Sequence, residues 1–562
     1  MNYLLCIALV FCHLTGWTQD TLFPVLISEV MSDPTPSVGL PDCEFVELYN
    51  NSEDSVQMHG WTWMVGEKSV HLTEAIISPW SCLVLVRSGD ENLFACKTLG
   101  LTKWLSLRNS GQYLVLKDPS GQIVHFTSYS QGQYHDVLQR DGGWSLELSC
   151  LDKPCDPDSW QVSKEVLGGS PGFLTASYCP EKSHSVFKAS RCAYLSDQEI
   201  IVLFSQPLLP SKPLQDLIII PDHHKIMDMA FFDDRCDQII LKFDSPIAPG
   251  MTYHIDVGGP VLDCNGRNLE PSLLKYGLPG ELDSGKLIIT EIMFDPDDTG
   301  LEYIEVFNLS DQILDLNQVL VATVDDLDWV KDFSREGDGS FLLFPQEYGL
   351  FCDDIIWFSK KYPEAPVETV SVRADLPALN NSGGGIRLLT QSHELIEEVV
   401  YDPDWHDDRL PDESGVSLER MNYHASGRMA GNWYSAAANV GHATPGCENS
   451  QMLYPAGDQY DKFKLSSDVV SQDSNGNDDL VIVQLKIDEP GYTGRFEVRH
   501  PSGILIRLIQ DWDVLPISGQ LYWDGLNEFQ HPVPTGIYIL IIHYTNANGT
   551  IKRWKKACAV ID

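Results

Sequence analysis

The sequence predicts an all-β protein built from β-sandwiches in tandem, and three observations support this fold class. Short segments such as EFVELYN (44–50) and EYIEVFN (302–308) alternate apolar and polar residues at a period of two, which is typical of half-buried strands. The chain has 42 glycines and 33 prolines that separate many short runs, and long amphipathic helical windows are scarce. Finally, one stretch of sequence occurs twice, which indicates a duplicated domain.

The duplication begins with LISEVMSDP (26–34) and IITEIMFDP (288–296), each followed by the strand segments quoted above. Four later landmarks repeat in the same order, so we predict two copies of one domain of about 150–170 residues. These landmarks are LRNSG (107–111) with LNNSG (379–383), SLEL (145–148) with SLER (417–420), Trp160 with Trp433, and GGSPG (168–172) with HATPG (442–446).

These landmarks resemble the bacterial lamin-tail domain, and the resemblance implies an Ig-like β-sandwich over residues 22–178 and 286–450. The second copy departs from the family where MHGWTW (58–63) becomes LNQVLV (316–321). Between the copies, residues 185–278 are similar to Ig-like domains of bacterial surface proteins. The fold class is therefore predicted more closely as all-β with tandem Ig-like sandwich domains.

The C-terminal part, residues 459–562, resembles the Ig-like domains of the hook-capping and gliding-associated type. The residues that carry this resemblance are Trp523-Asp524-Gly525 followed by PTGIY (534–538). In many such proteins this domain is the address for type IX secretion and surface attachment, which would make the secretion machinery a partner. Lys552, Arg553, Lys555 and Lys556 form a basic cluster there, which fits either a recognition strand or an edge strand guarded by lysine.

The first 19 residues have an apolar run, Tyr3 to Leu14, of the length expected for a signal peptide that is cleaved near Gln19. No other segment reaches the roughly 18 apolar residues that a transmembrane helix needs. We therefore expect a secreted protein, either extracellular or on the outer cell surface. The formal net charge of −42 argues against nucleic acid as a partner, because that binding depends on Lys and Arg.

The chain has 14 cysteines, of which Cys6 and Cys12 lie in the predicted signal peptide. Disulfides are expected in a secreted protein, although the sequence does not determine their pairing. Cys150 with Cys155 and Cys236 with Cys264 are candidate pairs, and no spacing typical of a zinc site occurs.

Two motifs invite a catalytic interpretation, and neither is convincing, so no catalytic residue is predicted. Gly168–Gly172 satisfies G-x-S-x-G, but a nucleophile elbow needs a helix after the serine, and Pro171 follows Ser170 at once. The paired glutamates, Glu44 with Glu47 and Glu302 with Glu305, lie at i and i+3 on a strand. They would point to opposite faces and could not flank one bond, so their repetition marks a requirement of the fold.

Two acidic segments are candidate cation sites, and calcium is the candidate ion for the first of them. Asp473, Asn475, Asn477 and Asp479 alternate along one loop, as Ca²⁺ ligands do, although an Asx-rich turn has the same composition. A second group gathers around His406, where a solvated acidic loop is the alternative: Asp402, Asp404, Asp407 and Asp408. Asp222-His223-His224 with Asp228 could also ligate a metal, but a solvated loop is the favoured interpretation.

Two functions remain open from the sequence. The first is a secreted, surface-located, non-enzymatic protein that binds an extracellular protein or polysaccharide through loops at the ends of its sandwiches. The second is a secreted metal-dependent hydrolase of the phosphoesterase or nuclease type, or its accessory binding subunit. Lamin-tail domains often accompany such enzymes, and the Asp402–Glu413 segment would then supply the metal site.

Overall fold

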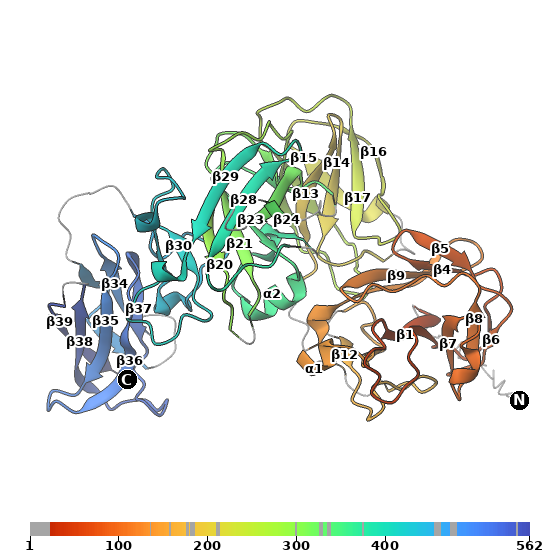
Figure 1. Ribbon diagram of the computed structural model, residues 1–562, viewed down its shortest axis with the longest axis horizontal. Helices are drawn as coiled ribbons and strands as arrows, with labels where there is room; N and C mark the ends of the chain where they lie inside the picture. Colours follow the sequence, from red (N-terminus) through yellow and green to blue (C-terminus); the bar gives the residue numbers. More distant parts are fainter. Residues whose placement is uncertain are drawn as a thin grey trace, which may run out of the picture. The chain divides into compact units, whose positions relative to one another are not determined.

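The computed structural model describes residues 23–561, apart from 135–136, 157–158, 176–178, 180–185, 210–213, 298–299, 325–329, 334–338, 374–375, 454–461, 473–479 and 547–548. The chain divides into two compact units, Met1–His184 and Ser185–Asp562. Strands dominate both units (Figure 1), and the predicted all-β fold class is confirmed. The finer domain limits given above stay predictions.

The first unit contains one β-sandwich. In spatial order, its six-stranded sheet consists of β12 (Trp160–Val162), β11 (Leu146–Leu148), β1 (Val25–Met31), β2 (Phe45–Asn50), β7 (Cys82–Arg87) and β8 (Thr98–Leu101). The facing sheet consists of β10 (Ile123–Ser130), β9 (Gly111–Lys117), β4 (Thr62–Val65) and β5 (Lys68–His71). A small ladder, β3 (Val56–Gln57) with β6 (Ile76–Ile77), and the short helix α1 (Val137–Arg140) complete the unit.

The second unit repeats this architecture in its middle part. Its six-stranded sheet consists, in spatial order, of β31 (Trp433–Ser435), β30 (Leu418–Arg420), β20 (Leu287–Met293), β21 (Tyr303–Asn308), β26 (Tyr348–Cys352) and β27 (Val370–Val372). The facing sheet consists of β24 (Val330–Phe333), β23 (Val319–Val324), β28 (Gly384–Thr390) and β29 (Leu395–Tyr401). The ladder β22 (Leu314–Asp315) with β25 (Leu342–Leu343) and the helix α2 (Ile355–Lys361) belong to the same part.

The two six-stranded sheets have the same strand order and the same strand directions. In each sheet the strand pair at one edge is parallel, β7 with β8 in the first and β26 with β27 in the second, and the other pairs are antiparallel. The central strands β1 and β20 are buried at every position instead of alternating. One face packs on the second sheet, and the other is covered by apolar residues and by the segment that follows β12 or β31. The duplicated sequence thus encodes a duplicated sandwich, called here the first copy and the second copy.

Two further sandwiches flank the second copy within the second unit. The preceding one has a sheet of β13 (Ala189–Ser196), β14 (Glu199–Phe204), β17 (Gln238–Phe243) and β16 (Ile226–Phe231). Its other sheet has β15 (Ile218–Pro221), β18 (Tyr253–Gly258) and β19 (Ser272–Tyr276). Phe187, Ile200, Leu241, Ile255 and Tyr276 are among the residues of its common core.

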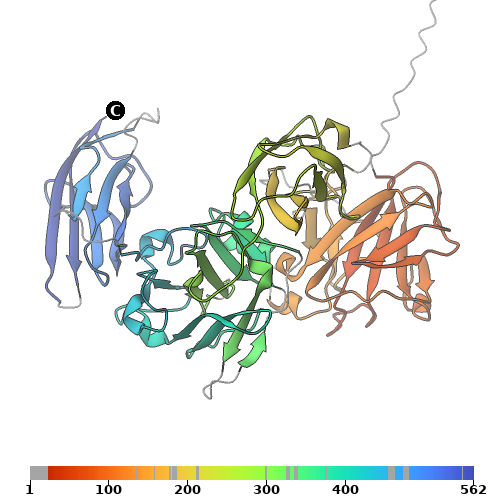
Figure 2. The ribbon, with the colours of Figure 1, turned by 90° about the horizontal axis from the view of Figure 1, so that it is seen from above.

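The C-terminal sandwich (blue in Figure 2) has its own core around Trp523 and Phe496. Its smaller sheet consists of β32 (Phe463–Leu465), β34 (Val481–Lys486) and β37 (Ser518–Trp523). Its larger sheet consists of β33 (Val469–Ser471), β39 (Lys552–Ile561), β38 (Gly536–Thr545), β35 (Thr493–Arg499) and β36 (Leu505–Val514). The basic cluster lies at the start of β39, whereas β33 pairs only with its last three residues.

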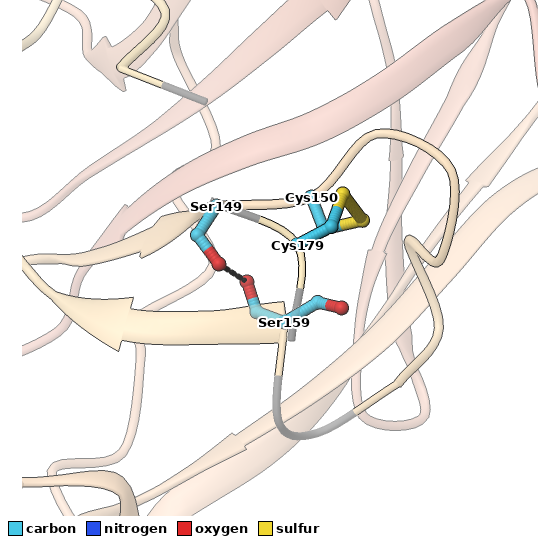
Figure 3. The surroundings of a disulfide bond; sticks show 4 residues. All are labelled: Ser149, Cys150, Ser159 and Cys179. Atoms are coloured by element: carbon cyan, nitrogen blue, oxygen red, sulfur yellow. Dashed lines mark hydrogen bonds between the residues drawn. A yellow bond between two sulfur atoms is a disulfide. The ribbon is translucent and has the colours of Figure 1, made fainter. Parts of the chain in front are cut away.

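One disulfide is present, and its pairing corrects the prediction for Cys150. Cys150 is joined to Cys179 rather than to Cys155, and the bond closes a separation of 29 residues (Figure 3). It ties the end of β11 to the chain beyond the turn at 168–172. Beside it, the hydroxyl of Ser149 donates to the carbonyl oxygen of Ser159 at 2.9 Å (Figure 3).

The second candidate pair, Cys236 with Cys264, is not joined. The amide of Leu208 donates to the carbonyl of Cys236, and the amide of Cys264 donates to the carbonyl of Pro207. The N–H and C=O groups of the peptide between Pro207 and Leu208 point in opposite directions. The two cysteines therefore lie on opposite sides of this segment, which explains why they do not bond.

We expect Cys150→Ser to destabilise the first copy by about 3–4 kcal/mol, because the open chain regains the entropy of a loop of this size. Scanning calorimetry of the full chain should show one transition moved to lower temperature. Reduction of the native protein should have the same effect, and Cys43→Ser, which removes a cysteine outside the disulfide, should not. An unchanged transition after reduction would show that the disulfide does not stabilise this sandwich.

Candidate functional site

A row of three buried glutamates crosses the six-stranded sheet of each copy. In the first copy, Glu29 of β1 lies directly opposite Glu47 of β2 on one side and Glu147 of β11 on the other. In the second copy, Glu291 holds the central place between Glu305 and Glu419. Cross-strand neighbours have Cβ atoms about 4.5–5.5 Å apart, so these carboxyl groups lie side by side. We call each row a glutamate ladder.

A β-bulge next to the central glutamate shapes both ladders. The strand register shifts between Ile27 and Glu29, and in the second copy between Ile289 and Glu291. The residue in between carries a hydroxyl group: Ser28 donates to Glu47 in the first copy, and Thr290 donates to Glu305 in the second. The bulge adds one residue to the strand, which brings a donor onto the ladder face.

The backbone disturbed by the bulge finds a different partner in each copy. In the first copy, the amide of Ile27 donates to Nδ1 of His125 at 3.0 Å. Burial lowers the pKa of His125 to about 3, so the ring is neutral and this nitrogen can accept. In the second copy, Arg420 Nη1 donates to the carbonyl of Ile289 at 3.0 Å.

In the first copy, the turn at 168–172 binds the ladder directly. The amide of Ser170 donates to Glu29 Oε1 at 2.9 Å, and its hydroxyl donates to Glu147 Oε1 at 2.9 Å. The amide of Gly172 donates to Glu47 Oε2 at 2.6 Å. A Cβ atom on Gly172, whose φ is +98°, would lie 2.4 Å from Cβ of Cys96, so only glycine fits here. The turn thus closes the sandwich by binding carboxylates of all three strands.

The second copy repeats these contacts with a threonine in place of the serine. The amide of Thr444 donates to Glu291 Oε1 at 2.9 Å, and its hydroxyl donates to Glu419 Oε1 at 2.8 Å. The amide of Gly446 donates to Glu305 Oε2 at 2.7 Å. The hydroxyl of Tyr303, which has no counterpart in the first copy because Phe45 takes its place, donates to Glu291 Oε1 at 2.7 Å.

Burial and mutual repulsion change how the ladders ionise. Burial raises the pKa of Glu29 well above its ordinary value, and the neighbouring Glu47 raises it further. Burial also raises the pKa of Glu305 well above the ordinary range, with Glu291 adding to the effect. Burial first and Glu291 second raise the pKa of Glu419 to about 7. The ladders therefore hold protons at a pH where exposed glutamates are ionised.

Glu29 shows where one proton would lie. Its Oε1 accepts from Ser145 and Ser170, whereas its Oε2 is buried and has no hydrogen-bond partner among the described residues. A buried carboxylate oxygen without a donor is costly, while a protonated oxygen can donate to a neighbouring carboxylate. The ladder is thus suited to sharing protons within the core.

The residues of the two catalytic motifs have structural positions. Ser170 holds the ladder, and the residues after it form a turn that Phe173 closes with its amide. Glu44 and Glu47 have separate partners, since Glu44 accepts from Trp104 Nε1 and Glu47 belongs to the ladder. Glu302, the counterpart of Glu44, accepts from the amide of Leu379 at 2.8 Å.

The acidic segment after β29 is not gathered around one point. Asp402 caps a short turn by accepting from the amide of Asp404 at 2.9 Å. Asp407 is buried and forms a bidentate pair with Arg409, and the Tyr434 hydroxyl also donates to it. Among the described residues, no three His, Cys, Asp or Glu side chains form a group that could hold a metal ion. Arg409 thus already neutralises Asp407, the buried carboxylate of the group, and the cation site at Asp402, Asp404, Asp407 and Asp408 stays a prediction.

The other two candidate metal segments give different outcomes. His224 lies in the aromatic core with Nδ1 2.7 Å from the hydroxyl of Tyr276, and Asp222 lies 3.7 Å from His254 Nδ1 and 3.9 Å from His223 Nε2. Asp228 accepts from the amide of Met229 and does not join them. The predicted calcium residues Asp473, Asn475, Asn477 and Asp479 lie outside the described residues.

In the sequence, all six ladder positions stand within the repeated landmarks or among the paired acids, and nothing there groups them. The third rung was visible in SLEL and SLER, which place Glu147 and Glu419 at the same point of the repeat. The signal that could have joined the rungs was the repetition of hydroxyl residues beside them. These are Ser28 with Thr290, Ser145 with Ser417, and Ser170 with Thr444.

The profile of the Lamin Tail Domain family matches residues 20–131. This match includes Glu29 and Glu47 but ends before Glu147 and the turn that binds it. None of the curated proteins matches the sequence.

Several solved structures resemble parts of the chain at low TM-scores. The bacterial surface layer protein SbsC (domains 1–6) is 12% identical, covers 67% of this chain and 54% of its own, and has a TM-score of 0.15. PorZ, a surface component of the type-IX secretion system of Porphyromonas gingivalis, is 8% identical, covers 92% and 74%, and has a TM-score of 0.16. A DUF4876 family protein from Bacteroides thetaiotaomicron is 12% identical, covers 37% and 82%, and has a TM-score of 0.18. The chain thus spans about half of SbsC, and likenesses this weak carry no argument about function.

Within the described part of the chain, no helix combines the length and apolar character that crossing a bilayer requires.

The ladders should make the sandwiches less stable as the pH rises. A folded pKa above the ordinary 4.5 means that the folded state binds more protons, so the free energy of unfolding falls from about pH 4.5 upward. For Glu419 alone this loss extends through about pH 7 and amounts to roughly 1–3 kcal/mol. Calorimetry from about pH 5 to about pH 9 should show this decline.

Glu305→Gln should flatten the decline for the second copy, because an amide cannot ionise. The substitution can keep both hydrogen bonds: its oxygen would accept from Gly446 N, and its amide would donate to the Thr290 hydroxyl after that group rotates. Glu394→Gln, on an exposed turn, is the matched control and should follow the native curve. If both variants decline as the native protein does, the ladder does not set the pH dependence.

Proposed function

We propose that this is a non-enzymatic extracellular protein in which sandwich modules form a scaffold that presents binding loops. The observation that carries the proposal is that the glutamates repeated between the copies in the two ladders are interior residues. All six ladder glutamates are buried, and each accepts hydrogen bonds from groups that close its own sandwich. The duplication has therefore preserved the architecture of a module rather than the reactive groups of an active site.

Contacts inside the second unit support a scaffold role. Arg191 of β13 donates to the carbonyl of Ser340 at 2.9 Å, and its guanidinium carbon lies 4.4 Å from the ring centre of Phe341. Burial lowers the pKa of this guanidinium to about 10, where it remains charged at neutral pH. Lys275 and Glu347 add an ion pair of 2.6 Å. A half-buried arginine that bridges two sandwiches favours a fixed arrangement of these sandwiches over independent movement.

The wider proposal follows the sequence resemblances. The second copy has the strand order and ladder of the first, which supports a second lamin-tail domain over 286–450. The disulfide fits an oxidising compartment, in agreement with secretion. Loops at the sandwich ends would bind an extracellular protein or polysaccharide, and the C-terminal domain would be read by the secretion machinery.

Surface proteolysis of intact host cells tests the location. We expect the full-length protein to be cleaved by an added protease, and a chain that stops at Asp458 to be protected inside the cell. Both chains must first be found in equal amounts by immunoblot after lysis. If both chains are protected, the protein is not presented on the surface and the proposed location is wrong.

Turnover assays test the absence of enzymatic activity. The purified protein with Mn²⁺ or Ca²⁺ is expected to hydrolyse no phosphomonoester, phosphodiester or nucleic-acid substrate above a buffer blank. Turnover that is abolished by Asp404→Ala and retained by Glu394→Gln would instead establish the hydrolase alternative, with the metal bound at the acidic segment after β29.

A further inference from the structure

The third rung of the second ladder is hydrogen-bonded to a segment that also contacts the C-terminal sandwich. Glu419 Oε2 accepts from the hydroxyl of Ser450 at 2.7 Å and from the amide of Gln451 at 2.8 Å. The Ser450 hydroxyl accepts in turn from the amide of Ala437 at 2.9 Å, so its own hydrogen is directed to Glu419. Both donor residues are buried.

The same two residues bind the loop between β36 and β37. The amide of Ile517 donates to the carbonyl of Ser450 at 2.8 Å, and Gln451 Nε2 donates to the carbonyl of Leu515 at 3.3 Å. The ladder carboxylate and the C-terminal sandwich are therefore separated by only two residues, each of which is hydrogen-bonded on both sides.

Other contacts of this interface lie around the two residues. Arg409, fixed by Asp407, donates to the carbonyl of Gly491 at 2.8 Å and to the Thr493 hydroxyl at 3.1 Å. Burial lowers the pKa of His442 in the closing turn, and the charge of Asp513 on β36 partly offsets this effect. Arg409 corresponds to Val137 in the first copy, so this contact belongs to the second copy alone.

We propose that Glu419 is a proton-sensitive tie: its ionised carboxylate holds Ser450 and Gln451 in the position that the C-terminal sandwich binds, and its protonation loosens that docking. Hydrogen bonds to a charged acceptor are roughly twice as strong as those to a neutral one. The amide of Gln451 is fixed by the backbone, and the hydrogen of the Ser450 hydroxyl is directed to Glu419 because the hydroxyl oxygen accepts from Ala437. A neutral Glu419 therefore holds both donors less firmly.

The chemistry of the site places this change near neutral pH, since the pKa of Glu419 is raised to about 7 by burial and by Glu291. His442 would act in the opposite direction, because its protonation attracts Asp513. Burial lowers the pKa of His442, which moves that effect to more acidic pH. The titratable groups that act on Glu419 are Glu291, Glu305 and Tyr423, and Tyr434 lies opposite it on β31. Further charged or titratable groups act on these neighbours or lie at the interface with the C-terminal sandwich: Cys447, Asp407, Arg409, His442 and Asp513.

The predicted pH dependence of the docking differs in sign from the pH dependence of the stability of the sandwiches. A higher pH weakens each sandwich, because the folded state binds the additional protons. The same rise strengthens the docking, because the docked state binds the ionised form of Glu419. Docking and module stability should therefore change in opposite directions over the same range.

Hydrogen exchange of the full-length protein, read by mass spectrometry, tests the proposal. The reporter is the amide of Ile517, which donates to Ser450, read in the peptides that contain it with rates corrected for intrinsic exchange. In the native protein we expect protection to rise about tenfold from about pH 6 to about pH 8, the result of strengthening two hydrogen bonds. In Glu419→Gln the protection should stay at the low value throughout.

Three variants keep the outcome decisive. Glu147→Gln changes the matching rung of the first copy, which accepts from Ser170 and Thr175 of its own sandwich, and should leave the reporter as in the native protein. His442→Asn should also retain the rise near neutral pH. If Glu419→Gln fails to protect β20 and β21, its fold is disturbed, and Ser450→Ala then replaces it and should lower protection at about pH 8. A flat native profile, or a native-like rise in Glu419→Gln or in Ser450→Ala, overturns the proposal.

Discussion

The burial of three carboxyl groups in a row is the constraint on which each copy of the repeated sandwich depends. An ionised carboxylate in the core is costly unless it is neutralised or hydrogen-bonded, and three side by side add mutual repulsion. The fold meets this cost with donors from the bulge, from Ser145 or Ser417, and from the closing turn. The turn has no regular secondary structure of its own, so its position depends on the carboxylates that it binds. Ladder and turn therefore require each other.

This dependence explains why the sequence predicts the duplicated sandwich but not the glutamate ladder. The period-two pattern and the repeated landmarks were sufficient to predict sandwiches and their duplication, because alternation reports burial on one face. The ladder itself was hidden, since glutamate within a strand normally reads as a solvent-facing residue. Glu47 and Glu305 were recognised as demands of the fold from their repetition alone. Glu147 and Glu419 join these rows because β11 and β30 lie next to β1 and β20. Local sequence patterns do not predict that strand order.

The acidic segment after β29 shows the limit of reading composition. The four aspartates around His406 suggest a cation site, but one of them, Asp407, already pairs with Arg409 of the same segment. A bidentate pair satisfies the buried carboxylate of Asp407 and directs the remaining guanidinium donors toward the C-terminal sandwich. The charged residues of a segment can be assigned as metal ligands or as ion-pair partners only once it is known which of them are buried. The cysteines gave a similar lesson, because proximity in sequence favoured Cys155 whereas the fold brought Cys179 to Cys150.

The contact between the first strand and the closing turn has a mechanical consequence. In each copy the chain enters the six-stranded sheet through β1 or β20 and leaves it through the closing turn, and these two segments are joined at the central glutamate. Tension applied to the two ends of the second copy acts first on the hydrogen bonds of Ser450 and Gln451 to Glu419, and then on those between Glu291 and Thr444. In the first copy the disulfide between Cys150 and Cys179 carries the tension to the end of β11 and shields the bonds of Ser170. Most of the remaining strands lie outside this short path between the points of attachment. A module like the second copy would bear load through its buried carboxylates, and its resistance to pulling would vary with the acidity of the medium.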